Sequence, residues 1–177
     1  MGKGQKLFLI AFLLMLIYGC GARHITPGKY GIESDSIQNL KGGLPITIKI
    51  PKFAENEYHI ANANPKIKSN FYINLNELHN DAKVLIETEL INHDVPLTSN
   101  AQKFLKITFT NLQWESWAGG FTFGVYLDFD VETSDGYSIN YQVQDSGRRM
   151  SRAIGGSVSR AVEKMFQDFE IIKFINK

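Results

Sequence analysis

The longest regular alternation of apolar and polar side chains runs along residues 121–132. Six apolar side chains occupy every second position there: Phe121, Phe123, Val125, Leu127, Phe129 and Val131. The positions between them are mostly polar, so the pattern predicts a strand with one buried and one exposed face. Residues 137–143 repeat this alternation, and Asp135-Gly136 between the two runs predicts a tight hairpin.

Two other stretches carry apolar residues at the spacing of an α-helix. Residues 77–92 follow Asn76, which we expect to be the N-cap, and residues 151–169 carry a second apolar stripe. Three shorter runs predict further strands: residues 45–50, 71–75 and 104–112. The polar segment 52–70 predicts a long loop, and the apolar tail 171–175 is expected to pack back on the domain or to add a last strand.

These elements follow one another in the order ββαβββα. Each helix has one apolar stripe and the sheet has one apolar face, and these surfaces leave water when they pack together. The predicted fold class is therefore α+β: a two-layer sandwich of a mainly antiparallel sheet with two amphipathic helices packed on one face.

The first twenty residues have the composition of a secretory signal. Lys3 and Lys6 precede an apolar run at residues 7–18, which is shorter than the roughly 20 residues that a membrane-spanning helix needs. Residues 16–20, Leu-Ile-Tyr-Gly-Cys, resemble the bacterial lipobox, whose cysteine is lipidated and becomes the new N-terminus. The resemblance implies that Cys20 carries a diacylglyceryl group and an N-acyl chain such as palmitate, which together suffice for stable anchoring.

Removal of a signal peptide at residues 1–19 leaves 158 residues, enough for one domain with a hydrophobic core. Residues 20–43 are predicted to be a flexible tether after the lipidated cysteine, because the segment has few apolar residues to bury. Residues 44–177 form the predicted globular domain. The mature chain has a formal net charge of −1, since only Lys3 and Lys6 are lost, and this near-neutral balance argues against a nucleic-acid partner. Cys20 is the sole cysteine, so no internal disulfide is possible.

Candidate chemistry is sparse. Asp128, Asp130 and Glu132 share one strand face, where they are either a cation or acid–base site or the exposed face of a half-buried sheet. The four histidines, at positions 24, 59, 79 and 93, show no metal-ligand spacing, and no nucleophile or phosphate-loop motif is present. We therefore expect no catalytic residues, no metal and no cofactor, and a protein that is not an enzyme.

Two groups of residues are candidates for partner binding. Trp114 and Trp117 flank a predicted turn, where aromatic side chains either bind a partner or a membrane interface, or cap the core. Arg148, Arg149 and Arg152 lie at the start of the last helix, where they either meet an anionic partner or are ordinary surface charge. Three cations at a helix N-terminus oppose the helix dipole, a small cost that favours a role outside the helix.

The arrangement resembles the YajG-type lipoproteins of Gram-negative bacteria over residues 44–175. Residues 72–75 leading into the first helix, the strand pair around Asp135-Gly136 and the ending 168–175 carry this resemblance. It implies a periplasmic lipoprotein, and Gly21 after the cysteine implies the outer membrane, on its periplasmic face. We expect a non-catalytic binding or scaffolding component of an envelope assembly or transport system, with an envelope protein as partner. The alternative is a carrier of a small ligand or lipid.

Overall fold

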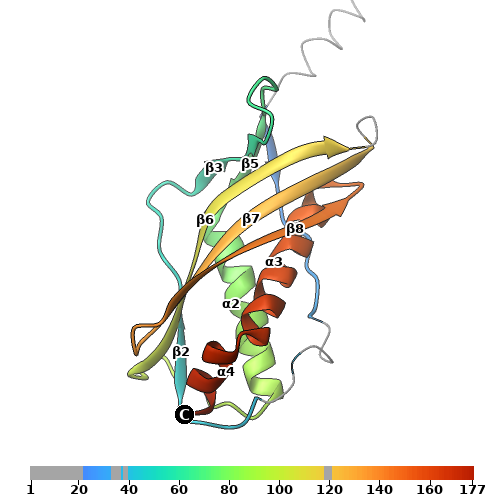
Figure 1. Ribbon diagram of the computed structural model, residues 1–177. Helices are drawn as coiled ribbons and strands as arrows, with labels where there is room; N and C mark the ends of the chain where they lie inside the picture. The colour runs from blue at the N-terminus through green and yellow to red at the C-terminus, as the bar shows by residue number, and fades with distance from the viewer. Residues whose placement is uncertain (1–21, 33–36, 38–39, 118–120) are drawn as a thin grey trace, which may run out of the picture.

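The computed structural model describes residues 22–32, 37, 40–117 and 121–177. The fold is α+β, with a twisted sheet lying across two long helices (Figure 1). The strands of this sheet, in spatial order, are β2 (Ile46–Lys49), β6 (Lys103–Trp117), β7 (Thr122–Thr133) and β8 (Ser138–Gly147), and β4 (Ala61–Asn62) also pairs with β6. Helices α2 (Leu75–Asn92) and α3 (Met150–Gln167) cover one face, as the sequence predicts.

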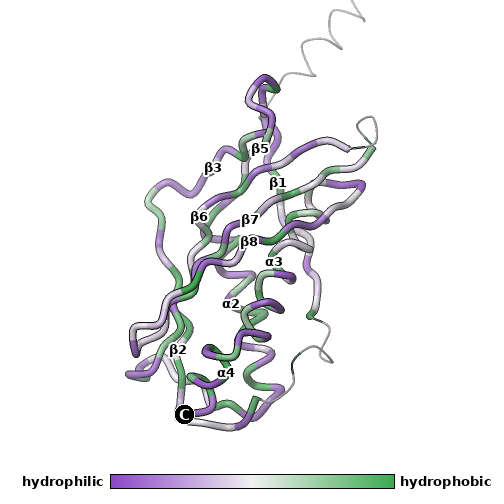
Figure 2. Tube along the Cα trace, viewed as in Figure 1, coloured by the Kyte–Doolittle hydropathy of each residue, from purple (hydrophilic) through white to green (hydrophobic). Residues whose placement is uncertain are grey.

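Pairing within this sheet is antiparallel along β6, β7 and β8, and parallel where β2 and β4 join β6. The predicted hairpin forms at Asp135-Gly136, where Gly136 has a φ of 94° that glycine adopts without steric cost. The inner face of the sheet packs on the apolar stripes of the helices, and Figure 2 shows these apolar segments along both layers. Phe129 and Phe166 are the largest side chains that are fully buried between the two layers.

A second, three-stranded sheet was not predicted. It contains β1 (Arg23–Ile25), β5 (Phe71–Asn74) and β3 (Glu57–His59), in that spatial order. β1 runs parallel to β5, and the Arg23 amide donates to the Asn70 carbonyl at 2.7 Å. The strands β3 and β4 lie in the segment 52–70 that we expected to be a loop, because two or three mostly exposed residues give too short a pattern to identify.

The described residues of the segment predicted as a tether pack against the domain. In addition to the pairing of β1, Pro27 is buried and the Gly28 amide donates to the Ser151 carbonyl at 2.8 Å. Ile37 and Leu40 are also buried, with 3% and 8% of their surfaces exposed. In the described part of the tether predicted over residues 20–43, these contacts differ from a free segment, and they arise because a few apolar residues reach a core that the rest of the chain supplies.

Glycines in α3 explain how this segment approaches the helix. A Cβ atom at Gly155 would lie 2.0 Å from the Gly28 carbonyl oxygen, which is backbone and therefore hard to move. A Cβ atom at Gly156 would lie 1.7 Å from the Asp145 carboxylate on β8. The first glycine thus admits the N-terminal segment, and the second admits the sheet.

The ends of two helices differ from their predicted positions. Asn74, rather than Asn76, caps α2, because its side-chain oxygen accepts from the Asn76 and Glu77 amides at 3.0 and 3.1 Å. The apolar tail forms the helix α4 (Phe169–Asn176), whose residues Ile171, Phe174 and Ile175 pack back into the core. No helix in the described part of the chain is long and apolar enough to cross a membrane.

Candidate functional site

The two candidate tryptophans occupy different environments. Trp114 is buried, with 8% of its surface exposed, and its ring meets the Phe71 ring edge-on at 4.9 Å between centroids. Its indole N–H donates to the Ser69 hydroxyl at 2.9 Å. Trp114 is therefore a core residue, and its hydrogen-bonded indole explains how it is accommodated there.

Trp117 lies on the outer face of the sheet near the β6–β7 tip, with 36% of its surface exposed. Its ring packs directly on the backbone of Gly124, where a Cβ atom would be 2.8 Å from the indole. Its indole N–H donates to the Glu115 carboxylate, which also accepts from the Tyr126 hydroxyl and raises the pKa of that tyrosine. These contacts hold Trp117 in place while part of its surface stays open to solvent.

Phe121 lies directly before β7, on the other side of the same tip, and 80% of its surface is exposed. Phe123, two positions later, instead packs inward, with its ring centroid 5.9 Å from that of Trp114. The strand alternation therefore continues, but at Phe121 it extends beyond the core. The two sides of this tip therefore each carry an exposed aromatic side chain, since Trp117 ends β6 and Phe121 directly precedes β7.

The register of the sheet brings two of the arginines to this tip. Gly147, the last residue of β8, pairs with Phe123 of β7, so Arg148 and Arg149 follow directly beside the aromatic tip. Both side chains are exposed, and neither forms an ion pair within the described residues. We call Trp117, Phe121, Arg148 and Arg149 the hairpin patch.

Arg152 lies one turn further along α3 and has a partly structural role. Its aliphatic stem packs on Gly147, and its guanidinium carbon lies 5.5 Å from the centre of the Tyr30 ring. A guanidinium over an aromatic ring is a favourable contact, so Arg152 helps to hold the N-terminal segment on α3.

The carboxylates on the outer face of β7 have cross-strand partners. Glu132 pairs with Lys106 at 2.9 Å, Asp128 accepts from the Asn111 amide at 3.2 Å, and Asp130 accepts from the Asn140 amide. Each partner comes from a neighbouring strand, as is usual for polar pairs on a sheet surface. The arrangement is a ladder of separate pairs, and no group of three metal-ligating side chains occurs in the part of the chain that the structure describes.

His79 is a buried hydrogen-bonding group of the core. Its Nδ1 lies 2.7 Å from the Leu75 carbonyl oxygen, and its Nε2 accepts from the Phe109 amide at 2.9 Å. These partners assign the proton of the neutral ring to Nδ1. Burial lowers the pKa of His79, although the Leu75 carbonyl acts in the opposite direction. The histidine therefore links α2 to β6 in its neutral form.

A small cavity of about 150 Å³ lies between residues 27–30, α2 and α3. Tyr30, Val84 and Val158 form part of its apolar lining, and Asp81 lies at its polar side. Burial raises the pKa of Asp81, and the nearby Lys29 opposes that shift. The cavity has the size of a small organic molecule, since a protein cavity of about this volume holds benzene.

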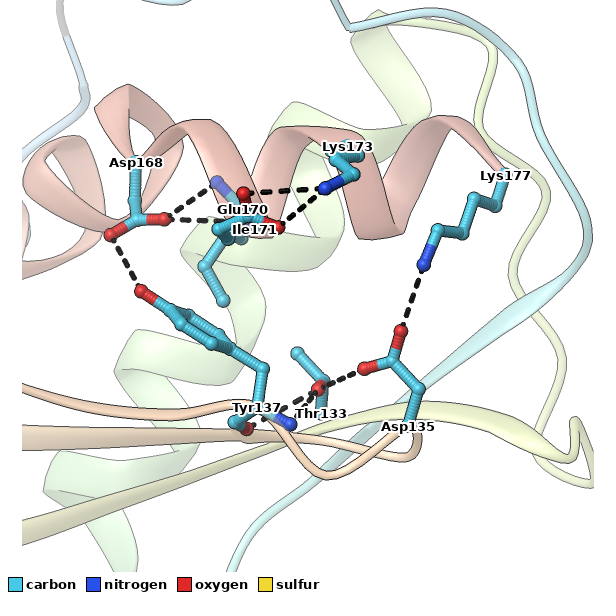
Figure 3. Close-up of polar contacts among 8 residues, drawn as sticks. All are labelled: Thr133, Asp135, Tyr137, Asp168, Glu170, Ile171, Lys173 and Lys177. Atoms are coloured by element: carbon cyan, nitrogen blue, oxygen red, sulfur yellow. Dashed lines mark hydrogen bonds and ion pairs between the residues drawn. The ribbon is translucent and has the colours of Figure 1, made fainter.

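The opposite end of the molecule carries a polar cluster of a different kind (Figure 3). Asp168 caps α4 by accepting from the Glu170 and Ile171 amides at 2.9 and 3.1 Å. Its other oxygen accepts from the Tyr137 hydroxyl at 3.3 Å, which ties the start of α4 to the β7–β8 hairpin.

The C-terminal residue closes this cluster. Lys177 pairs with Asp135 at 3.0 Å, and the Thr133 hydroxyl donates to the same carboxylate. These hydrogen bonds hold the pKa of Asp135 below its usual value, and the bond from Thr133 contributes most. Lys173 pairs with Glu170 at 2.9 Å along α4. We call these residues the distal cluster: Thr133, Asp135, Tyr137, Asp168, Glu170, Lys173 and Lys177.

Further exposed residues near the hairpin patch were not identified from the sequence. Lys66, Ile67 and Lys68 lie in the loop between β4 and β5, and 47% of the surface of Ile67 is exposed. Arg23 begins β1 and lies next to the end of this loop, because it pairs with Phe71 and donates its amide to Asn70. The only available signal was an apolar residue between two lysines in a polar segment. Cys20, the predicted lipidation site, lies outside the described residues.

No family model and no curated protein matches this chain. Among solved structures, the fold is similar to that of protein XCC0632 from Xanthomonas campestris, described as a member of the family DUF330. The two chains are 8% identical, the alignment covers 86% of this chain and 93% of the other, and the TM-score is 0.49.

Proposed function

We propose that this chain is a lipid-anchored lipoprotein of the bacterial envelope that acts by binding and scaffolding, as one component of an assembly or transport system. The lipobox at residues 16–20 and the signal before it support the anchor. Gly21 supports the outer membrane, and the resemblance to YajG-type lipoproteins supports the periplasmic side.

The observation that carries a binding role is the hairpin patch, which can fix the orientation of the anchored domain while its other faces meet a protein partner. Trp117 is held by Gly124 and Glu115 with 36% of its surface exposed, and Phe121 on the other side of the tip is 80% exposed. Rigid aromatic side chains lose little conformational entropy on contact, and they are frequent anchors of binding surfaces. The carboxylates of β7, by contrast, are already paired with neighbouring strands.

Mass spectrometry of the mature protein from membranes tests the anchor. We expect a chain that begins at Cys20 with three acyl chains, and an intact leader or a free thiol would contradict the proposal. Photocrosslinking in intact cells tests the scaffold, with the reactive amino acid placed in turn at Thr108, Gln142 and Phe169. These positions lie on the outer sheet face and on α4, away from the core. One specific envelope protein is expected at one or more of these positions, and adducts with none would count against the role.

The cavity between residues 27–30, α2 and α3 favours a second candidate function, the carriage of a small ligand. Its volume of about 150 Å³ fits a small apolar molecule and is too small for a whole lipid acyl pair. Native mass spectrometry of gently purified protein tests this function. A stoichiometric added mass that V158F displaces would support it, and a protein without bound mass would leave the scaffold as the better description.

A further inference from the structure

We infer that the hairpin patch contacts the surface of an anionic phospholipid bilayer, with Trp117 and Phe121 at the boundary between head groups and acyl chains. The inference rests on the proposed lipid anchor and names the partner of the patch. It predicts that the domain lies on the membrane in one orientation, with this end facing the lipid. We call this end the proximal end: the hairpin patch together with Arg23, Lys66, Ile67 and Lys68.

The distance between the anchor and the fold is short. Arg23 is fixed in β1, where it pairs with Phe71 and donates its amide to Asn70. Three peptide units join Arg23 to Cys20, so their Cα atoms lie at most about 11 Å apart. A lipidated Cys20 therefore keeps Arg23, and the end of the molecule around it, within reach of the lipid head groups.

The position of the exposed apolar side chains agrees with a membrane contact. The loop that contains Ile67 lies beside Arg23 through the Asn70 hydrogen bond, and beside β6 through a hydrogen bond from the Ala63 amide to the Trp114 carbonyl. The end of β6 and the start of β7 lie at this same end of the molecule (Figure 1), and Trp117 and Phe121 belong to these strand ends. Tryptophan is enriched at membrane interfaces because its ring is apolar and its N–H is polar.

The charge of the proximal end agrees as well. The exposed cations of the proximal end form no ion pairs with acids in the described residues: Arg23, Lys66, Lys68, Arg148 and Arg149. Three acids at this end have partners of their own. Glu115 accepts from Trp117 and Tyr126, Asp145 pairs with Arg160 at 3.3 Å, and Glu57 lies 3.2 Å from His24. Each cation near an anionic bilayer strengthens binding by a factor of roughly five.

The anchor, the unpaired cations and the exposed apolar side chains together fit a lipid surface better than a protein surface. The anchor brings the proximal end to the head groups, the unpaired cations match their phosphates, and the apolar side chains stand where the interface begins. A protein partner at the same place would have to fit between the domain and the membrane, within the short reach that residues 20–23 allow.

Tryptophan fluorescence provides the test, because the chain has only Trp114 and Trp117. The full mature lipoprotein is reconstituted in phosphatidylcholine vesicles with or without phosphatidylglycerol, and brominated lipids serve as quenchers. We expect strong quenching that increases with phosphatidylglycerol. W117F should lose most of it, because the remaining Trp114 is buried. R148Q/R149Q should reduce quenching, as should added salt.

A matched pair of variants provides the control. In the W117F background, F121W places a tryptophan at the proximal end and F169W places one on α4 at the opposite end. Phe121 and Phe169 are similarly exposed, at 80% and 72%, so both exchanges should leave the fold intact. Quenching of F121W without quenching of F169W is the expected result. Equal quenching of both, or quenching of neither, would overturn the inference.

Vesicle flotation and mass spectrometry distinguish failure of the inference from failure of the proposed function. A chain that floats with lipidated Cys20 but shows no quenching of Trp117 overturns the membrane contact and leaves the anchor intact. A chain with unmodified Cys20 that does not float overturns the anchor, and the inference fails with it. A photoreactive residue at Phe121 should yield lipid adducts in cells, and a specific protein adduct there would also overturn the inference.

Discussion

Lys173 and Lys177 of the distal cluster lie 2.9 and 3.0 Å from acidic side chains, whereas Arg148 and Arg149 of the proximal end form no ion pair within the described residues. The two ends also treat their aromatic residues differently. Both Tyr137 and Trp117 donate to a carboxylate, but Trp117 keeps 36% of its surface exposed and Phe121 at the same tip is 80% exposed. The cations are thus paired with acids at one end and left without ion pairs at the other.

The paired groups at the distal cluster serve stability, whereas the unpaired cations at the proximal end serve binding. The polar groups of the distal cluster hold α4 and the C-terminus on the β7–β8 hairpin. Burial raises the pKa of Tyr141, and the Asp168 carboxylate acts in the same direction. Such contacts stabilise the folded chain but leave little for a partner. The unpaired cations of the proximal end repel one another slightly and gain only when an anionic surface approaches.

The largest effect is expected at the contact that holds residues 27–30, and with them the proximal end, on α3. G155A should destabilise the protein by roughly 1–3 kcal/mol, because the new methyl group meets the Gly28 backbone. A free tether at residues 27–30 would give the opposite sign, a gain of up to about 1 kcal/mol from helix propensity. Urea unfolding measures the difference. G156A is the control, with a smaller loss, since the Asp145 side chain can rotate away.

At the distal cluster, D168A should lower the free energy of unfolding by about 1 kcal/mol, because α4 loses its N-cap. D168N keeps a capping oxygen and should cost clearly less. Both variants should leave vesicle quenching of Trp117 unchanged. If D168A reduced quenching as well, the two ends would not be separate in function.

His79, which belongs to neither end, provides a pH-dependent reference. Burial lowers its pKa below the ordinary value of 6.5, so the unfolded chain binds the proton at higher pH than the folded chain does. The stability that depends on neutral His79 is complete above the ordinary pKa of 6.5, and it is lost as the pH falls through the lower pKa that His79 has in the folded chain. Unfolding in urea from about pH 8 to about pH 5 should show this loss. H79Q should flatten the profile, and an unchanged slope would contradict the assignment.

The smallest effect on stability is expected for F121A. Phe121 is 80% exposed, so its removal should change the free energy of unfolding by less than about 0.5 kcal/mol. Thermal unfolding checks this. The same variant should weaken the membrane contact of Trp117, and a marked loss of stability would show that the tip is part of the core.

The sequence by itself determined those elements whose pattern is local. The alternation in β7, the helical stripes of α2 and α3, and the turn at Asp135-Gly136 each follow from a few neighbouring residues, and the structure confirms the α+β fold that they predict. Periodicity in one segment is enough to identify a buried face.

Only the tertiary structure decided which side chains meet. Trp114 and Trp117 are three residues apart, yet the first is buried against Phe71 and the second lies outside. Arg148 reaches the β6–β7 tip because of the register between β7 and β8, and Arg23 is held by a strand nearly fifty positions away. These placements depend on strand register and on contacts between distant segments, which no local pattern encodes.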